Sequence, residues 1–278
     1  MSATVAVDNE PTTKGKSITQ RKKRLILPLG DKGGTSKSFI IRKLAEMHME
    51  AQRPGLQLVD GDATTGSLYK FHETHVETFS VHGSIDERDR LVNDVLRRGS
   101  NLVIADMPAT TLTRLREIAA DYDFVDAVTE AGYRLTVIAP ITPYDDPILD
   151  LQDAIEMFDP LIHAAATQSA STVEPRILAR VDYVAMVNLG FAEDRTDFEL
   201  WDAPDGFTRN LLHAAGGIEL EIPKLRQRIA AKLQKYRLSF KQGEASEHFS
   251  VTDRGRLHRW NQEVEKVLSS AGERLGFS

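Results

Sequence analysis

Short apolar runs along the chain alternate with stretches in which apolar residues recur every three or four positions. The short runs have the length and composition of buried strands, and they lie at 25–29, 56–60, 101–106, 134–140, 181–187 and 218–222. Helical spacing follows the first run and recurs at 87–98, 112–128, 147–158, 224–241 and 253–275. Repeated alternation of strand and helix predicts an α/β fold, in which helices cover both faces of a mostly parallel, twisted sheet in three layers.

Two segments depart from this alternation. Residues 1–20 are polar and rich in Ser, Thr, Lys and Gly, which predicts a disordered N-terminal tail. Residues 161–174 are rich in Ala, Ser and Thr and are predicted to form a loop or a frayed helix. The remaining 21–278 is long enough for one large α/β domain, and we expect a single domain there.

Composition excludes several classes of protein. With 41% hydrophobic and 27% charged residues, the chain has the composition of an ordinary globular protein. The sequence contains no cysteine, which argues against disulfides, iron–sulfur clusters and thiol-based metalloid sensing, and suits a reducing cytoplasm. No apolar run approaches the ~20 residues of a membrane span, and the start lacks the apolar core of a signal peptide. The net charge of −6 means that nucleic-acid binding would need a local basic patch.

The first candidate for chemistry is the stretch Asp-Lys-Gly-Gly-Thr-Ser-Lys-Ser at 31–38, between the first strand and the first helix. A glycine-rich loop in this position turns backbone N–H groups toward phosphate, and the helix start adds its positive dipole. We expect Lys37 to contact the β- and γ-phosphates of ATP and the Ser38 hydroxyl to contact Mg²⁺. Ser36 stands where a glycine is usual, which crowds one approach to phosphate. The alternative is a glycine turn that happens to carry lysines. The residues predicted to contact the nucleotide are Lys32, Gly33, Gly34, Thr35, Ser36, Lys37, Ser38 and Phe39.

Carboxylates end two of the predicted strands. Asp60 ends the second strand with Asp62 just beyond it, and Asp106 ends the next strand before Pro108. Strand ends of this kind point into the ligand crevice of an α/β sheet. Asp62 lies further into its loop and is the better candidate for the catalytic face, while Asp106 is suited to bind Mg²⁺ through water. The alternative for Asp60 and Asp62 is a pair of carboxylates that satisfies a turn or caps a helix.

Together these segments resemble the ParA/MinD family of dimerising ATPases. The resemblance lies in Lys-Gly-Gly-x-x-Lys-Ser at 32–38, a deviant Walker A motif, in Asp-x-Asp at 60–62 and in Asp-x-Pro at 106–108. It implies a P-loop NTPase fold with ATP between two subunits. Lys32 would reach the partner's nucleotide and Asp62 would orient the attacking water. The predicted surroundings of Mg²⁺ are Ser38, Asp62 and Asp106.

The resemblance extends along the chain from about 24 to 240. It implies that Asn188, at the end of the strand 181–187, contacts adenine; the alternative is a polar residue that caps the strand. The segments 125–132, 146–158 and 187–191 are similar to the TraL-like conjugation subgroup of plasmid-encoded ParA relatives.

A basic stretch follows the last predicted strand. Seven basic residues and no acid occur between 224 and 241, and an apolar stripe of helical spacing runs through them. An unpaired basic helix face on an acidic chain is a candidate contact for DNA phosphates, and a solvated helix surface is the alternative. The predicted DNA-binding residues are Lys224, Arg228, Lys232, Lys235 and Arg237.

The leading functional hypothesis is a slow Mg²⁺–ATP-dependent ATPase that forms a homodimer on ATP binding. As the resemblance implies, it would act as a switch in plasmid partition, cargo positioning or conjugation, with nonspecific DNA binding, a plasmid- or transfer-encoded partner protein and no membrane contact. The alternatives are a metabolic synthetase or amidoligase on the same fold, and a nucleotide-binding scaffold with negligible turnover.

Overall fold

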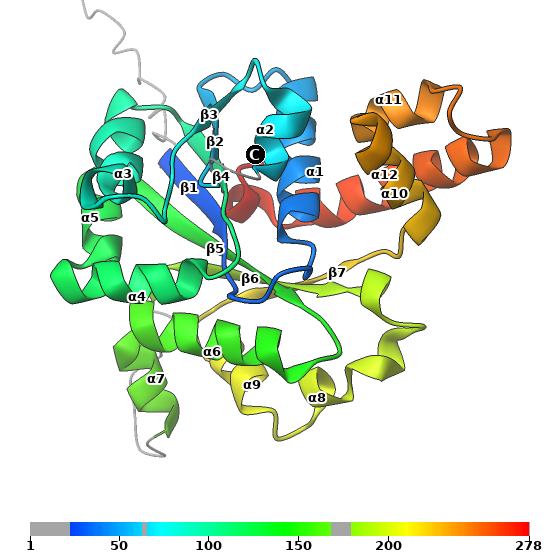
Figure 1. Cartoon of the computed structure of the whole chain (residues 1–278). Coiled ribbons are helices and arrows are strands. Elements are labelled where there is room, and N and C mark those ends of the chain that lie inside the picture. Colours follow the sequence, from blue (N-terminus) through cyan, green and yellow to red (C-terminus); the bar gives the residue numbers. More distant parts are fainter. Residues whose placement is uncertain (1–22, 63–65, 168–178, 278) are drawn as a thin grey trace, which may run out of the picture.

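The computed structural model describes residues 23–62, 66–167 and 179–277, so the tail predicted at 1–20 lies outside the described residues. Within them, seven parallel strands form one sheet in the order β3-β2-β4-β1-β5-β6-β7 (Figure 1). Helices cover both faces, which confirms the predicted α/β fold. The strands are β1 Lys23–Pro28, β2 Leu56–Asp60, β3 Val76–Thr78, β4 Leu102–Asp106, β5 Tyr133–Ile141, β6 Asp182–Asn188 and β7 Ile218–Ile222.

The first strand lies at the centre of the sheet, between β4 and β5, and its carboxyl end opens into the glycine-rich loop. Pro28 ends β1 and has no N–H to donate. Leu29 donates its N–H to Ile138 of β5, and successive N–H groups of a strand point to opposite sides, so position 28 faces β4. Pairing with β4 stops at Ile26, opposite Ile104, and therefore no ladder bond is lost at the proline.

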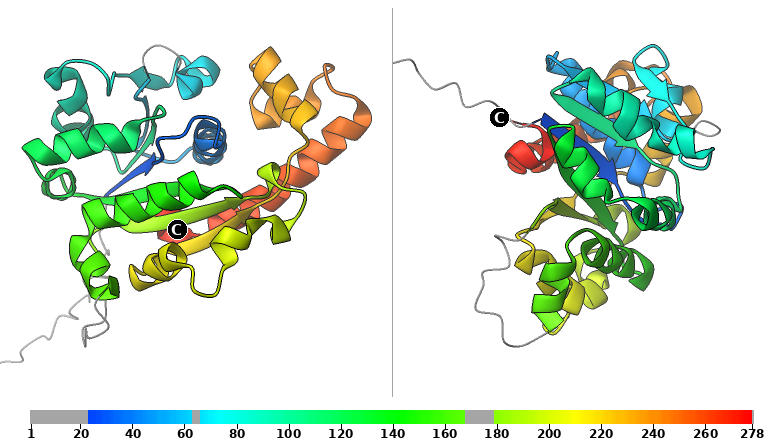
Figure 2. Two further views of the ribbon diagram at one scale, coloured as in Figure 1. Left: turned by 60° about the horizontal axis from the view of Figure 1, so that its bottom comes forward. Right: turned by 90° about the vertical axis from the view of Figure 1, so that its left-hand side faces the viewer.

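One face of the sheet carries the first helix and, beside it, the C-terminal helices (Figures 1 and 2). They are α1 Lys37–Glu50, α2 Ser67–His72, α10 Gln227–Tyr236, α11 Phe240–Ala245 and α12 Val251–Ser270, followed by a 3-10 turn at Gly272–Leu275. The other face carries α3 Ile85–Arg90, α4 Thr111–Asp121, α5 Phe124–Glu130, α6 Asp145–Phe158, α7 Pro160–Thr167, α8 Glu199–Asp202 and α9 Phe207–Ala214. Shorter helical turns lie at Leu91–Val95, Leu96–Arg98, Leu189–Phe191 and Arg195–Phe198.

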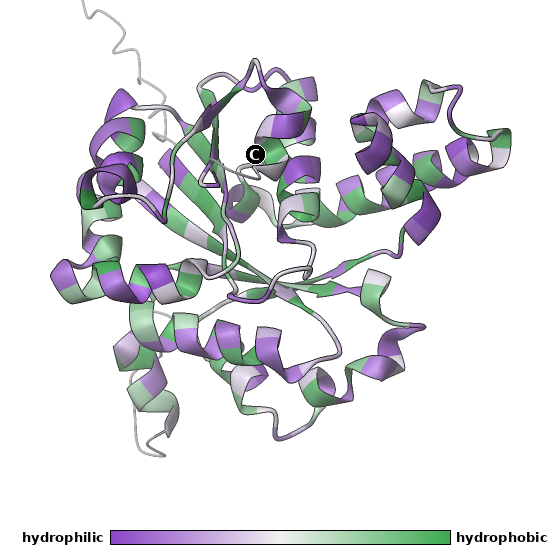
Figure 3. Cartoon of the chain, viewed as in Figure 1, coloured by the Kyte–Doolittle hydropathy of each residue, from purple (hydrophilic) through white to green (hydrophobic). Residues whose placement is uncertain are grey.

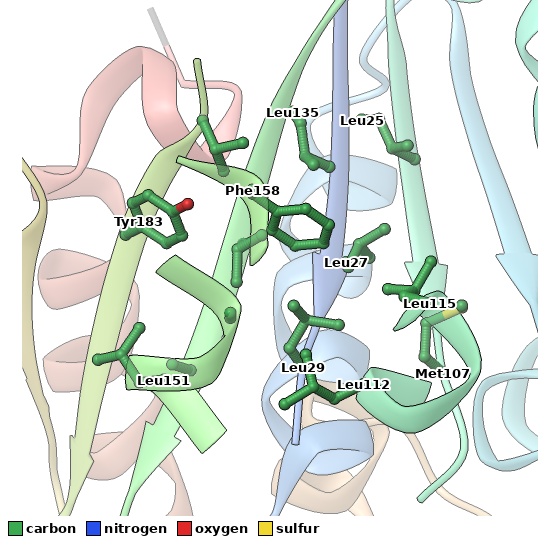
Figure 4. Close-up of a cluster of buried hydrophobic side chains, with 14 of the residues drawn as sticks. Leu25, Leu27, Leu29, Met107, Leu112, Leu115, Leu135, Leu151, Phe158 and Tyr183 are labelled. Carbon is green, nitrogen blue, oxygen red and sulfur yellow. The ribbon is translucent and has the colours of Figure 1, made fainter. Parts of the chain in front are cut away.

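A hydrophobic cluster lies on each face of the sheet. Figure 4 shows Leu25, Leu27 and Leu29 packing toward the side chains of α4 and α6 on one face. Ile26 points to the opposite face, where it joins Ile41 and Leu44 of α1. Because successive strand residues face opposite sides, a strand covered on both faces is apolar throughout, whereas α4 and α6 alternate hydrophobic and hydrophilic positions (Figure 3).

The C-terminal helices attach to α1 through polar as well as apolar contacts. Arg42 is buried, and its guanidinium lies 3.8 Å from the ring centre of Phe71 and 4.5 Å from that of Phe240. Burial lowers the pKa of Arg42 to about 10. The Glu46 carboxylate accepts the backbone N–H of Phe240 at 2.8 Å, so the first turn of α11 is tied to the helix that follows the glycine-rich loop.

Four predicted helices differ from those observed. The one predicted at 87–98 is α3 followed by the short turns Leu91–Val95 and Leu96–Arg98. The helix predicted at 112–128 is two, α4 and α5, and the one predicted at 253–275 ends at Ser270 before a 3-10 turn. The basic stretch is two helices because Arg237 adopts a left-handed conformation, with φ of +50°, that ends α10. Part of the segment predicted as a loop or frayed helix is α7, and the rest lies outside the described residues. Among the described helices, none combines the length and apolar character needed to cross a bilayer.

Candidate functional site

A cavity of about 280 Å³ lies beside the loop between β1 and α1. Figure 1 shows this loop at the carboxyl edge of the sheet. Gly33 to Phe39 line one side, Asp62 after β2 lines another, and Met107 to Ala109 after β4 complete it. A Cβ on Gly33 or Gly34 would meet no atom within 4 Å, and Gly34 has a φ of +80°. The structure therefore brings together the three segments that the sequence singled out, and leaves space beside the two glycines.

Ser36 takes a left-handed conformation, with φ of 70°, immediately before α1. Glycine reaches this region freely, whereas a serine there costs on the order of 1–2 kcal/mol. The side chain makes no capping hydrogen bond to α1. The substitution noted in the sequence is thus accommodated by local backbone strain.

Lys37 begins α1 and is buried, with 6% of its surface exposed. Its ammonium donates to the carbonyl of Lys32 at 2.7 Å, and burial lowers its pKa against the opposing effect of Asp150 and Asp106. A buried ammonium gains from an anion placed beside it. Lys37 is therefore suited to bind phosphate in the cavity.

Ser38 and Asp106 face each other across the end of the sheet. The Ser38 hydroxyl donates to Asp106 Oδ1 at 3.0 Å, and Asp106 is 2% exposed. Burial, with a contribution from nearby Asp60, raises the pKa of Asp106 to about 7. A cation bound at this carboxylate would offset the free-energy cost of burying its negative charge.

These oxygen donors fit Mg²⁺, which takes few protein ligands and keeps waters and substrate phosphates. No group of three or more His, Asp or Glu side chains is arranged to hold a metal ion in the described part of the chain. A cation here would therefore depend on the substrate for part of its coordination. Ser38 and Asp106 are the residues that would hold it.

The two carboxylates at the end of β2, Asp60 and Asp62, have different surroundings. Asp60 is buried, and its side chain accepts the backbone N–H groups of Asp62 and Tyr69, each at 3.0 Å. Asp62 is partly exposed, lines the cavity and forms an isolated β-bridge with Ser80. Asp60 thus satisfies the turn, which is the alternative that we gave for the two carboxylates. Its hydrogen bond to the Asp62 N–H also holds Asp62 at the cavity. The role of Asp62 toward water or metal stays a prediction.

Lys32 extends away from the cavity. Its ammonium bonds to the Asp146 carboxylate in the first turn of α6, and its side chain is 57% exposed. The neighbouring Asp145 and Asp150 add to the effect of Asp146, which raises the pKa of Lys32. An outward-facing lysine is what the resemblance implied, but here an acid of the same chain binds it.

A second cavity, of about 290 Å³, shares Gly34, Ser36 and Phe39 with the first. Asn188 lines it, and the Asn188 Oδ1 accepts the N–H of Gly190 at 2.9 Å, so this side chain caps the turn after β6. The other lining residues include Phe191, Ile222, Pro223 and Leu225, which the sequence analysis did not assign to the site. Pro223, directly after a strand, was the signal that could have indicated them.

Phe39 borders both cavities and also packs against the C-terminal helices. Its ring centre lies 5.0 Å from that of Phe240, edge to face, and 5.5 Å from that of Trp260. Contacts of this kind stabilise packing. The aromatic ring of Phe39 therefore connects the candidate site to α11 and α12.

The prediction of an unpaired basic face is wrong for Arg228, which has an acidic partner, whereas DNA binding by the stretch stays a prediction. Arg228 pairs with Asp253 of α12 at 2.6 Å, Lys224 bonds to the Ala192 carbonyl, and Lys232 donates to the His248 carbonyl at 2.9 Å. Asp253 lies outside 224–241, so the absence of acids within that stretch gave no sign of its pairing with Arg228. Lys235 and Arg237 have no acidic partner among the described residues and are exposed.

Comparison with known proteins gives matches only among solved structures, because no protein-family model and no curated protein matches the chain. A plasmid partition protein from Borrelia burgdorferi, bound to AMPPNP, has a TM-score of 0.49 and 11% identity, over 90% of this chain and 100% of that one. The chain is similar to proteins of the ParA and MinD family.

Two further matches are of the same kind. MinD from Pyrococcus horikoshii, in complex with Mg-ADP, has a TM-score of 0.46 and 14% identity, over 90% of this chain and 99% of that one. The ATP complex of McdA from Cyanothece has a TM-score of 0.43 and 9% identity, over 89% and 97%. At these identities, any conclusion about activity depends on the site itself.

Proposed function

We propose that this protein is an Mg²⁺-dependent ATPase of the ParA/MinD type that dimerises when ATP binds and acts as a molecular switch. The observation that carries the proposal is the convergence of buried Lys37, the Ser38–Asp106 pair and Asp62 on one cavity. The adjoining cavity beside Asn188 supports the assignment, because it provides room for a base next to the phosphates. We also infer that 21–278 acts as one domain.

In this mechanism, backbone N–H groups of the loop and the Lys37 ammonium bind the β- and γ-phosphates. Mg²⁺, when bound, neutralises phosphate charge. Asp62 orients a water toward the γ-phosphate, and Asp60 holds Asp62 in place through its backbone N–H. Lys32 of the second subunit would add a positive charge to the phosphates. Turnover would be slow, and the change between monomer and dimer would be the output.

The same proposal extends to biological role. A switch of this kind could serve plasmid partition, conjugation or cargo positioning, with a plasmid- or transfer-encoded partner and with DNA as a surface. The alternatives on the same fold are a synthetase or amidoligase and a scaffold without turnover. The strained Ser36 favours keeping the scaffold as an alternative, because strain in the loop could slow hydrolysis without preventing binding.

Two variants test the assignment. Lys37→Ala should abolish ATP binding, measured with a fluorescent ATP analogue, because it removes the buried cation. Asp62→Ala should bind ATP but release phosphate at least about a hundredfold more slowly, since positioned water activation contributes factors of about 10²–10⁴.

The matched controls are the exposed Lys266→Ala and Asp121→Ala, which change the same side-chain types far from the cavity. Unchanged ATP affinity in Lys37→Ala would overturn the phosphate site. Tight ATP binding by the unsubstituted protein, without phosphate release, would instead identify the scaffold.

A further inference from the structure

A groove of about 550 Å³ lies between the start of α10 and α12, and it adjoins the cavity beside Asn188 at Leu225. Both helices belong to the C-terminal group α10, α11 and α12 (Figures 1 and 2). Leu225, Ile229 and Trp260 supply an apolar surface within the groove, and Ile229 and Trp260 are buried. Three exposed arginines line it as well: Arg226, Arg256 and Arg259. The groove therefore combines an apolar surface with cationic side chains.

Two of these arginines are available to a ligand. Arg226 and Arg259 have no acidic partner among the described residues, whereas Arg256 lies 3.4 Å from Asp253. Asp253 is already paired with Arg228 at 2.6 Å. On a chain of net charge −6, an anionic ligand could approach Arg226 and Arg259 without displacing an existing ion pair.

Gly255 is the second observation that points to a ligand. It lies within the twenty-residue helix α12 and lines the groove, and a Cβ added there would meet no atom within 4 Å. Glycine is among the least favourable residues in a helix, and here no packing or backbone conformation requires it. Its presence leaves the backbone of α12 open to close approach from the groove.

We propose that this groove binds an acidic segment of a partner protein. A large apolar side chain of that segment would pack against Leu225, Ile229 and Trp260, and flanking carboxylates would pair with Arg226 and Arg259. A peptide fits better than nucleic acid, because a phosphate backbone gains little from an apolar surface. Glu263, which also lines the groove, would repel phosphates.

The groove can be tested apart from the proposed ATPase. Pro223 to Leu225 separate it from the cavity beside Asn188, and Trp260 donates to the Pro223 carbonyl at 2.8 Å, which fixes that wall. Binding of an acidic peptide can be measured without nucleotide. Failure of the ATPase assignment and failure of this inference are therefore distinguishable.

The experiment uses the full chain and a fluorescein-labelled decapeptide, in which Leu-Phe is flanked on each side by four acidic residues. Fluorescence anisotropy should show saturable binding. The double variant Arg226→Glu/Arg259→Glu should weaken binding at least about tenfold, since it reverses both free charges. Gly255→Trp should weaken it similarly by filling the groove, while Gly255→Ala, which adds only a Cβ, should weaken it less. Replacing Leu-Phe by Ser-Ser in the peptide should also weaken binding at least about tenfold.

The control is Arg97→Glu/Lys266→Glu, which changes the net charge equally through exposed residues outside the groove. It should alter the affinity less than about threefold. Absence of binding, or equal losses in the control and the groove variants, would overturn the inference. So would binding of a random 20-base-pair duplex that is lost in Gly255→Trp while the peptide does not compete, because the groove would then be a nucleic-acid contact.

Discussion

At the scale of single residues, the contact between Lys32 and Asp146 decides what the outward-facing lysine can do. Asp146 belongs to the first turn of α6, and both side chains are largely exposed. An exposed pair of this kind is weak and screened by salt. If Lys32 must reach a second subunit, Asp146 competes with that subunit's phosphates for the same ammonium.

We therefore expect Asp146→Asn to favour the ATP-dependent dimer. The dimer dissociation constant, measured by light scattering with ATP present, should fall by no more than about fivefold, as expected for an exposed pair. Lys32→Ala should instead lose the dimer and keep the ATP affinity of the monomer. Asp145→Asn is the matched control, because Asp145 neighbours the pair without bonding to Lys32. A normal dimer from Lys32→Ala would contradict the role of this lysine between subunits.

At the scale of elements, α10 has an apolar face against the sheet and a basic face whose charges are unequal. Ile229 and Leu233 are buried, whereas Lys235 and Arg237 are exposed at its C-terminal end. Arg228, by contrast, is paired with Asp253 across to α12. Basic side chains without an acidic partner can contact DNA without breaking an ion pair within the protein, and Arg228 cannot.

The triple variant Lys232→Glu/Lys235→Glu/Arg237→Glu should eliminate nonspecific DNA binding in the presence of ATP. Each single substitution that removes a phosphate contact should reduce the slope of log affinity against log salt concentration by roughly 0.9. Arg228→Gln should leave the slope nearly unchanged, because this arginine is engaged with Asp253. Fluorescence polarisation on random duplex DNA at several salt concentrations measures both.

Phosphate release without DNA should remain nearly normal in the triple variant, because these residues lie outside both cavities of the candidate site. Equal DNA binding by the unsubstituted chain and the triple variant would show that this face is merely solvated. Absence of binding by either would lead to the same conclusion.

At the scale of the whole molecule, the end of the chain packs back onto the first helix. His48 of α1 lies 2.9 Å from the Leu275 carbonyl through Nε2, and its ring stacks on Phe277 at 4.5 Å. Arg53 bonds to the Gly276 carbonyl. Burial lowers the pKa of His48 to about 4, and the nearby Arg53 charge acts in the same direction. The buried ring is therefore neutral in the folded protein at neutral pH.

This arrangement predicts a loss of stability in mild acid. Between about pH 6.5 and pH 4 the unfolded chain binds a proton at His48 and the folded chain does not, so the free energy of unfolding falls as pH falls. From pH 6.5 to pH 5 the contribution of this group is about 2 kcal/mol. Urea unfolding at pH 7 and pH 5 should show a smaller loss in His48→Gln than in the unsubstituted chain. Parallel losses in the two proteins would assign the acid sensitivity to other groups.

Local patterns in the sequence determined the strands, most helices and the location of the glycine-rich loop. Buried strands and amphipathic helices are recognisable because their hydrophobic spacing repeats over a few residues. The loop at 31–38 and the strand-end carboxylates are equally local, since each depends on neighbouring residue types. The short β3 and the helices α2, α8 and α9 were missed, because such short elements depend on the rest of the fold for their stability.

Only the tertiary structure decided how the charges are paired and which carboxylate is buried. Asp146 is far from Lys32 in sequence, and Asp253 is separated from Arg228 by helix α11, yet each pair is in contact. Burial distinguishes Asp60 from Asp62, although both lie at the end of the same strand. Electrostatic partners and burial depend on the distances that folding creates between remote segments, and spacing along the chain does not contain those distances.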